Sequence, residues 1–333
     1  MKRDLDLTAR AGANVARVDI GWASLEEAGK GKRSRWYVRR LDHFMAAAKT
    51  RGIKVIATLV GSPCWASTAP RVLKRGCRGA WWERGVEIYP PRRATDYGDA
   101  ARFIAKRYGS RLAALEIWNE PNLEDYFASR RPAADYARLV KAGYRGSKRG
   151  DRSVPVLAGS LAWSDVPFLE KLWRRGIRGY YDGISIHPYN EGRAPASSSP
   201  EEDEQYSFLH GPRSVHAAQR ATGDETDLWL TEFGWSSCAD GAWCVGESQQ
   251  ASYVKQAFEL LESEPHVRAA TVYNLRERGD DPVDREDNYG LVNLDFSPKP
   301  AYGALRSALR EPRGARPSAF QSAIFTSLFG VVV

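Results

Sequence analysis

Short apolar segments alternate with amphipathic segments along most of the 333 residues of this chain. Each apolar segment has the length of a buried strand, about 4 to 8 residues, and apolar residues recur at helical spacing between them. The predicted strands are residues 15–20, 55–60, 115–119, 156–159, 183–187, 228–232 and 269–274. The clearest predicted helices are residues 36–50, 96–108, 133–149, 166–175, 212–222, 248–263 and 299–309. This alternation predicts an α/β fold with a parallel sheet or barrel.

The number of strands decides which α/β fold is expected. Seven strands are recognisable, whereas a closed (β/α)8 TIM barrel has eight. Residues 1–12 predict the helix that precedes the strand at 15–20, and no strand stands before that helix. We therefore expect a TIM barrel that lacks its first strand at the N-terminus, through a late start site or a truncation.

The composition gives no sign of a second domain. No Pro/Gly/Ser-rich linker divides the chain, and residues 196–204 are interpreted as a loop inserted in a single domain that spans residues 1–312. Residues 313–333 form a tail whose apolar end is shorter than the ~20 residues needed to span a bilayer. A peripheral helix, a disordered end and out-of-frame translation after Arg313 are all open for this tail. No stable membrane span is expected, and the chain is predicted to be a monomer.

The charge balance permits acidic partners without selecting one. Lys and Arg number 49 against 41 Asp and Glu, a formal net charge of +8, which suits nucleic acid, an anionic membrane or an acidic polysaccharide. The basic residues are scattered, and there is no Gly-rich phosphate loop, zinc finger or RNP-like motif. We therefore expect no nucleic-acid partner. The five histidines form no H-E-x-x-H or comparable cluster, so neither a catalytic metal nor another cofactor is expected.

The four cysteines fall into two close pairs, Cys64 with Cys77 and Cys238 with Cys244. This arrangement predicts two local disulfides and an oxidising compartment, either extracellular or the cell envelope. Reduced thiols or one zinc site with four sulfur ligands are alternatives, although neither pair has the tight spacing common in structural zinc sites. No signal peptide is visible at residues 1–6, and we expect it to have been lost together with the missing strand.

Two predicted strands deliver a glutamate to the turn that follows. One continues into Trp118-Asn119-Glu120-Pro121, and the other into Thr231-Glu232-Phe233-Gly234. Both carboxylates are therefore expected at one end of the barrel. Such a pair is typical of the active site of a retaining glycosidase, in which one carboxyl group protonates the leaving oxygen and the other attacks the sugar. Taken singly, either glutamate could instead cap a helix or form a surface ion pair.

These two motifs resemble the acid/base and nucleophile motifs of clan A glycoside hydrolases. Further segments resemble family 39-type and neighbouring cellulase-like members: residues 58–66, 185–189, 288–291 and 297–302. The resemblance implies a retaining O-glycoside hydrolase in which Glu120 is the general acid/base and Glu232 is the nucleophile. It implies cleavage of the glycosidic bonds of an oligo- or polysaccharide by double displacement.

The resemblance also implies roles for residues beside the two glutamates. Asn119 is expected to bond the sugar 2-hydroxyl, and Arg17, a charge inside an apolar strand, to support the nucleophile carboxylate. An ion pair of Arg17 with Asp19 or Asp42 is the alternative. His187 and Tyr189 are expected to contact the sugar or hold the nucleophile, or else to be hydrogen-bonded core residues.

Aromatic side chains at strand ends are candidates for sugar binding, because the apolar C–H faces of sugars stack on aromatic rings. The candidates are Trp22, Trp65, Trp235 and Tyr273. The main alternative to a hydrolase is a barrel that binds carbohydrate without turnover. An open barrel that misplaces Arg17 would favour this second function, whereas the presence of both glutamates favours hydrolysis.

Overall fold

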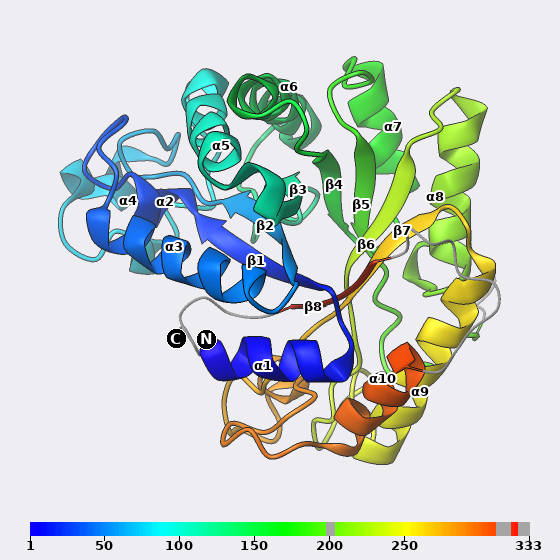
Figure 1. Cartoon of the computed structure of the whole chain (residues 1–333). Helices are drawn as coiled ribbons and strands as arrows, with labels where there is room; N and C mark the ends of the chain where they lie inside the picture. The colour runs from blue at the N-terminus through cyan, green and yellow to red at the C-terminus, as the bar shows by residue number, and fades with distance from the viewer. Residues whose placement is uncertain (198–203, 311–320, 326–333) are drawn as a thin grey trace. The chain divides into compact units, whose positions relative to one another are not determined.

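Eight parallel strands form a closed barrel in this computed structural model, in the order in which they follow one another along the chain (Figure 1). The structure describes residues 1–197, 204–310 and 321–325. The strands are β1 Val15–Gly21, β2 Lys54–Val60, β3 Leu112–Ile117, β4 Val156–Ala162, β5 Gly183–His187, β6 Asp227–Phe233, β7 Val267–Val272 and β8 Gln321–Phe325. The predicted TIM barrel fold is thus confirmed, with all eight strands present.

Helices lie between the strands, as the sequence pattern predicts. They are α1 Lys2–Ala11, α2 Trp22–Leu25, α3 Arg35–Lys49, α4 Arg71–Lys74, α5 Ala94–Tyr108, α6 Pro132–Gly150, α7 Val166–Arg174, α8 His210–Ala221, α9 Glu247–Leu260 and α10 Pro300–Arg310. Their ends follow local chemistry. Helix α7 begins after Asp165, whose carboxylate accepts the backbone N–H of Phe168 at 2.9 Å. Helix α1 ends at Gly12, which adopts φ +95°, a conformation that glycine accepts most readily.

The expectation that the barrel lacks a strand is wrong. Strand β8, in the apolar tail, pairs in parallel with β1, placing Val15 opposite Ala323 and Arg17 opposite Phe325. It also pairs in parallel with β7. The missing strand was sought before α1, but it comes from the other end of the chain. A strand that is buried on both faces does not show the alternation of apolar and polar residues that marks a half-buried strand. A five-residue strand of this kind therefore cannot be recognised by pattern within an apolar tail.

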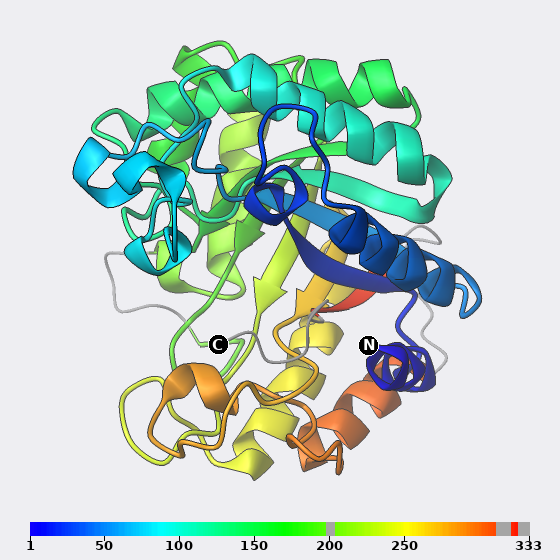
Figure 2. The same cartoon turned by 90° about the vertical axis from the view of Figure 1, so that its left-hand side faces the viewer.

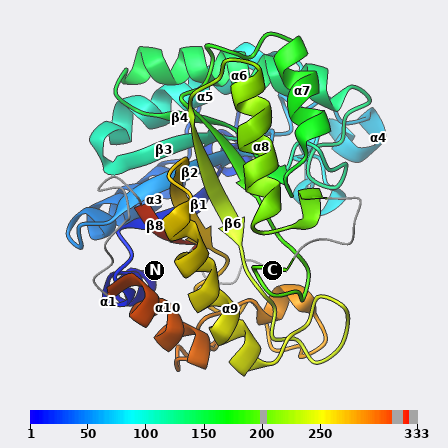
Figure 3. The same ribbon diagram turned by 90° about the vertical axis from the view of Figure 1, so that its right-hand side faces the viewer.

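The chain divides into two compact units, whose boundaries fall within β1, α3, β2 and β5. Unit 1 comprises residues 1–18, 47–54 and 186–333, and unit 2 comprises residues 19–46 and 55–185. The assignment of residues 1–312 to a single domain stays a prediction. In unit 1, α10 packs against α9 and α1, and Figure 3 shows α9 and α10 side by side. None of the helices within the described ranges has the length and apolar character that crossing a bilayer requires.

Close helix packing organises unit 2. Helices α5 and α6 lie side by side (Figure 2), and glycines allow the two backbones to approach. A Cβ atom added to Gly146 would stand 1.9 Å from the carbonyl oxygen of Gly98. The strands under these helices are mainly apolar, and every residue of β3 and β4 is buried, as expected for a parallel barrel covered by helices.

We expect the Phe325→Ala substitution to lower the free energy of unfolding by about 2 kcal/mol, as for a partly buried aromatic in a core. The ring of Phe325 stands 5.0 Å from that of Tyr273, and its carbonyl accepts the N–H of Leu275. Denaturant unfolding of the variant measures the loss, and Val283→Ala, at a side chain that is 61% exposed, is the control. Equal stability of both variants would show that β8 contributes little to the barrel.

A stacked histidine pair makes stability depend on pH. His216 of α8 and His266, which precedes β7, stack with ring centroids 4.1 Å apart. Burial chiefly, with the neighbouring His216, lowers the pKa of His266 from 6.5 to about 4, and Arg213 acts in the same direction while Glu264 opposes it. Burial and Arg220 likewise lower the pKa of His216.

Stability is therefore expected to fall as the pH decreases from 6.5 towards 4, because the unfolded chain binds protons in this window and folded His266 does not. Allowing for partial exposure of the site, the loss is about 1 to 2 kcal/mol. Urea unfolding at a series of pH values measures it. The His266→Gln variant should show a flatter pH profile, and an unchanged profile would assign the slope to other groups.

Candidate active site

Glu232 lies near the end of β6 and is held by two side chains of unit 1. Arg17 of β1, which is fully buried, directs Nη1 to Glu232 Oε1 at 2.5 Å. Tyr189, which follows β5, donates its hydroxyl to Glu232 Oε2 at 3.0 Å. His187 Nδ1 stands 3.7 Å from the same oxygen. This arrangement fixes the orientation of the carboxylate, and the adjacent guanidinium favours its ionised form.

The structure identifies Glu232 as an ion-pair partner of Arg17. Asp42, one alternative, accepts two hydrogen bonds from Arg107, at 2.6 and 2.8 Å. Arg17 forms an ion pair with Glu232, whereas Asp42 is engaged by Arg107. The other face of the guanidinium lies 5.5 Å from the centre of the Phe325 ring, so β8 helps to position it. This contribution of Phe325 was missed, because no strand was recognised in the tail.

Three tyrosines form a wall next to Glu232. The rings of Tyr189, Tyr273 and Tyr289 meet edge to face, with centroids 5.4 to 6.4 Å apart. Burial, together with the charge of Glu232, raises the pKa of Tyr189 well above its ordinary value. The Tyr189 hydroxyl therefore stays protonated and able to donate. Tyr273, which follows β7, is also buried, and its hydroxyl donates to Glu286 at 3.2 Å.

The predicted tryptophans differ in exposure. The Trp22 ring is fully buried and donates Nε1 to Glu26, and the Trp235 ring is buried and donates Nε1 to the carbonyl of Arg193. Trp65 is partly exposed, and its Nε1 is held by the carbonyl oxygen of Glu26 at 2.6 Å. Of the three, Trp65 is the one that is partly exposed, and contact of Trp22, Trp65 and Trp235 with sugar stays a prediction.

Glu120 belongs to unit 2, in the turn that follows β3. Its backbone adopts φ +45° and that of Trp118 adopts φ +65°, conformations that non-glycine residues hold only when their surroundings determine them. The Glu120 N–H donates to the carbonyl of Ser160 in β4 at 2.8 Å. The Trp118 N–H donates to Leu59 of β2 at 3.1 Å. Both neighbouring strands therefore hold the turn that presents Glu120.

Asn119 and a buried carboxyl group complete the site residues of unit 2. The Ser160 hydroxyl donates to Asn119 Oδ1 at 3.4 Å. Glu116, near the end of β3, is fully buried and accepts a hydrogen bond from the hydroxyl of Thr58 at 2.7 Å. Glu116 was not predicted as a site residue. The signal for it, a charged residue inside an apolar strand, was the one used for Arg17.

Both predicted disulfides are confirmed. Cys64 bonds to Cys77 and Cys238 bonds to Cys244. All four cysteines are therefore oxidised, which rules out a four-sulfur zinc site. Each bridge lies in a loop that follows a strand, β2 in one case and β6 in the other. The first also packs into a small cluster with Trp81 and Val86, which anchors its loop.

Known proteins of similar sequence and fold are glycosidases. No protein-family model matches the chain. A β-xylosidase from Caldicellulosiruptor saccharolyticus is 25% identical over 255 residues, covering 72% of this chain and 51% of the relative. A family 39 glycoside hydrolase from Bacteroides cellulosilyticus superposes with a TM-score of 0.72 and 22% identity, over 93% of this chain and 60% of that one. A monomeric β-xylosidase from Caulobacter crescentus superposes with a TM-score of 0.66 and 18% identity, over 94% and 65%.

The resemblance inferred from the motifs is thus confirmed, because the chain is similar to family 39 glycoside hydrolases and shares the TIM barrel fold with the solved structures. The chain spans about half the length of the curated relative that it matches.

Proposed function

We propose that this chain is the catalytic barrel of a retaining O-glycosidase that hydrolyses an oligo- or polysaccharide. The observation that carries the proposal is that Glu232 forms an ion pair with Arg17 and accepts a hydrogen bond from the Tyr189 hydroxyl. A carboxylate held by a buried guanidinium and a phenol keeps its negative charge and its orientation, both of which a nucleophile requires. The similarity to a β-xylosidase and to family 39 glycoside hydrolases supports the same reaction class.

In the proposed reaction, a Glu232 oxygen attacks the anomeric carbon while Glu120 protonates the departing oxygen. The bond to the leaving sugar breaks, and a covalent glycosyl ester forms on Glu232. Glu120, now ionised, then takes a proton from water, which attacks the anomeric carbon and releases Glu232. This mechanism requires the two carboxyl groups to stand roughly 5 to 5.5 Å apart. Both glutamates come from carboxyl ends of strands, which meet at one end of a barrel.

Substrate contacts are assigned to side chains around the two carboxylates. We assign Asn119 to the sugar 2-hydroxyl, whose hydrogen bond strengthens in the transition state. Trp65 and Tyr273 offer apolar surface for the sugar faces. Because the sequence relative is a β-xylosidase, an aryl β-xyloside is the first substrate to test. The two disulfides are consistent with an extracellular or cell-envelope location.

The test of the proposal is covalent trapping. An activated 2-fluoro-glycoside reacts with a retaining nucleophile and then hydrolyses slowly, because the fluorine destabilises the positively charged transition state of the second step. Peptide mass analysis should locate the sugar on Glu232. Turnover of aryl β-xyloside with trapping at another residue would remove Glu232 from the nucleophile role. Failure to turn over any glycoside, with the fold intact, would favour the carbohydrate-binding alternative.

Tyr189→Phe removes the phenol that holds Glu232 without changing the ring. We expect kcat to fall about tenfold to a hundredfold, because one hydrogen bond to a charged group contributes roughly 1.5 to 3 kcal/mol. KM should change little. Tyr206→Phe, at a tyrosine of the same unit, is the matched control. Steady-state kinetics that show the same kcat for both variants would mean that Arg17 alone positions the carboxylate.

A further inference from the structure

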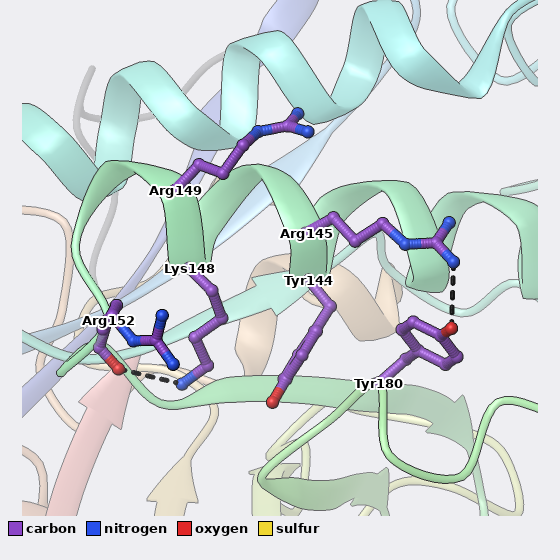
Figure 4. A pocket seen from close by; sticks show the side chains of 6 residues that line it. All are labelled: Tyr144, Arg145, Lys148, Arg149, Arg152 and Tyr180. Atoms are coloured by element: carbon purple, nitrogen blue, oxygen red, sulfur yellow. Dashed lines mark hydrogen bonds between the residues drawn. The ribbon is translucent and has the colours of Figure 1, made fainter.

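A basic cavity lies at the C-terminal end of α6 in unit 2 (Figure 4). Its volume is about 440 Å³, and none of its lining residues belongs to the candidate active site. They are Tyr144, Arg145, Lys148, Arg149, Arg152 and Tyr180. Because α6 ends at Gly150 and β4 begins at Val156, the cavity lies near the amino end of β4. Glu120 is held by Ser160, further along the same strand.

The cavity has an excess of positive charge. Lys148 pairs with Asp182 at 2.8 Å and also donates to the carbonyl oxygens of Arg152 and Val154. Within residues 1–197, 204–310 and 321–325, no carboxylate forms an ion pair with Arg145, Arg149 or Arg152. Four cationic side chains therefore line the cavity, and Lys148 is the one that interacts with nearby carboxylates, those of Asp182 and Asp151. An anion that entered the cavity would meet uncompensated guanidinium groups.

The helix terminus explains only part of this charge. Cations are favoured in the last turn of a helix by its dipole, which accounts for Lys148 and Arg149. Arg145 lies one turn earlier and Arg152 lies beyond the end of α6. Lys141, Arg145 and Arg149 follow one another at four-residue spacing, where like charges destabilise a helix by about 0.2 to 0.5 kcal/mol per pair. Helix stability alone therefore does not account for the cluster.

The two tyrosines hold the cations instead of offering open ring faces. The Arg145 guanidinium lies 4.7 Å from the centre of the Tyr180 ring and donates to the Tyr180 hydroxyl at 2.9 Å. The Lys148 ammonium lies 5.3 Å from the Tyr144 ring. Figure 4 shows Arg145 extended along Tyr180 and linked to its hydroxyl. The cavity thus presents oriented N–H donors, which suit oxyanions, whereas single-stranded nucleic acid is usually bound by stacking on free aromatic faces.

We propose that this cavity binds the carboxylate or sulfate groups of an acidic polysaccharide, as a second carbohydrate contact of the barrel away from the catalytic end. The preference for oxyanions comes from the cavity alone. The choice of a polysaccharide as the molecule that carries them rests on the proposed glycosidase function. A bidentate guanidinium matches a carboxylate or sulfate group in shape, so Arg145 and Arg152 are the residues expected to contact it.

The test measures dissociation constants for the whole chain carrying Glu232→Gln, which prevents turnover. The probes are an oligogalacturonate, a sulfated oligosaccharide, a neutral oligosaccharide of equal length, a single-stranded oligonucleotide of equal charge, and inorganic phosphate. The cavity variant is Arg145→Gln with Arg152→Gln. The control variant, Arg39→Gln with Arg71→Gln, alters two exposed arginines on α3 and α4 and changes the net charge equally.

The dissociation constant of the acidic oligosaccharide is expected to be at least about tenfold higher for the cavity variant than for the Glu232→Gln protein, which corresponds to about 1.4 kcal/mol of binding free energy. For the control variant it should be nearly unchanged. Whether the carboxylated or the sulfated probe binds more tightly identifies the oxyanion, and either result supports the site. Equal weakening in both variants would show diffuse charge attraction and overturn the proposal. Tighter binding of the oligonucleotide, or of phosphate alone, would overturn it in favour of a nucleic-acid or simple-anion site.

The outcome separates this inference from the catalytic proposal. Binding that depends on the cavity, in a protein whose unsubstituted form hydrolyses no glycoside, would support the cavity and count against the glycosidase. Hydrolysis without cavity-dependent binding would overturn the cavity and leave the glycosidase standing.

Discussion

Glu232→Gln is expected to lower kcat for an aryl β-xyloside by roughly 10⁴-fold or more, the order of loss seen when a covalent nucleophile is removed. The amide has the size of the carboxylate, and its single oxygen can still accept a hydrogen bond from Arg17, which binds one of the two carboxylate oxygens, while its NH2 group faces Tyr189. The neutral amide does not attack the sugar. The measurement is steady-state kinetics, with circular dichroism to establish folding. Glu170→Gln, at an exposed ion pair of α7, is the matched control.

Chemical rescue distinguishes a lost nucleophile from a damaged site. In Glu232→Ala the side chain leaves room for a small anion, and added azide should restore turnover of an activated substrate. Azide would then occupy the face from which Glu232 attacks, so the product should be a glycosyl azide of inverted configuration. Unchanged hydrolysis in Glu232→Gln, without added anion, would rule out Glu232 as the nucleophile.

The residues around the proposed nucleophile could largely be predicted, because each stands out from its immediate sequence neighbours. Glu232 ends an apolar strand and precedes a turn, and Arg17 is a charge in a strand that is otherwise apolar. A buried charge needs a partner, so an ion pair for Arg17 was predictable. The pairing with Glu232 was not predictable from this requirement, because Asp19, Asp42 and Glu232 meet it equally well in the sequence, and only the fold places Glu232 within 2.5 Å of Arg17.

Other features depend on contacts that no local pattern records. Strand β8 is a strand only because β1 and β7 provide its partners. Its pairing with β1 joins residues far apart in the sequence, such as Val15 and Ala323, and such pairing produces no periodic pattern in the sequence. The exposure of the predicted tryptophans also could not be read from the sequence. Trp22 and Trp65 both follow strands. Trp22 contacts Glu26 and Tyr97 and is fully buried, whereas Trp65 is partly exposed.

Replacing Glu120 with Ala is expected to lower kcat/KM by about 10² to 10⁴-fold for a substrate with a poor leaving group, the usual contribution of general acid catalysis. The loss should be much smaller for an activated aryl glycoside, whose leaving group departs without a proton. Rates measured over a series of leaving groups should therefore show a steeper dependence on leaving-group pKa than in the unsubstituted protein. Glu124→Ala, at an exposed glutamate in the same turn, is the control.

The same substitution should alter the second step in a way that a structural defect does not. Without a general base, water attacks the glycosyl ester slowly, so the intermediate accumulates and azide accelerates its breakdown to a glycosyl azide of retained configuration. The decrease of kcat/KM at high pH, where the acid of the unsubstituted protein is ionised, should also disappear. Equal losses for good and poor leaving groups, with no azide effect, would assign Glu120 to holding the turn between β3 and α6, because proton transfer is the only role that predicts the difference.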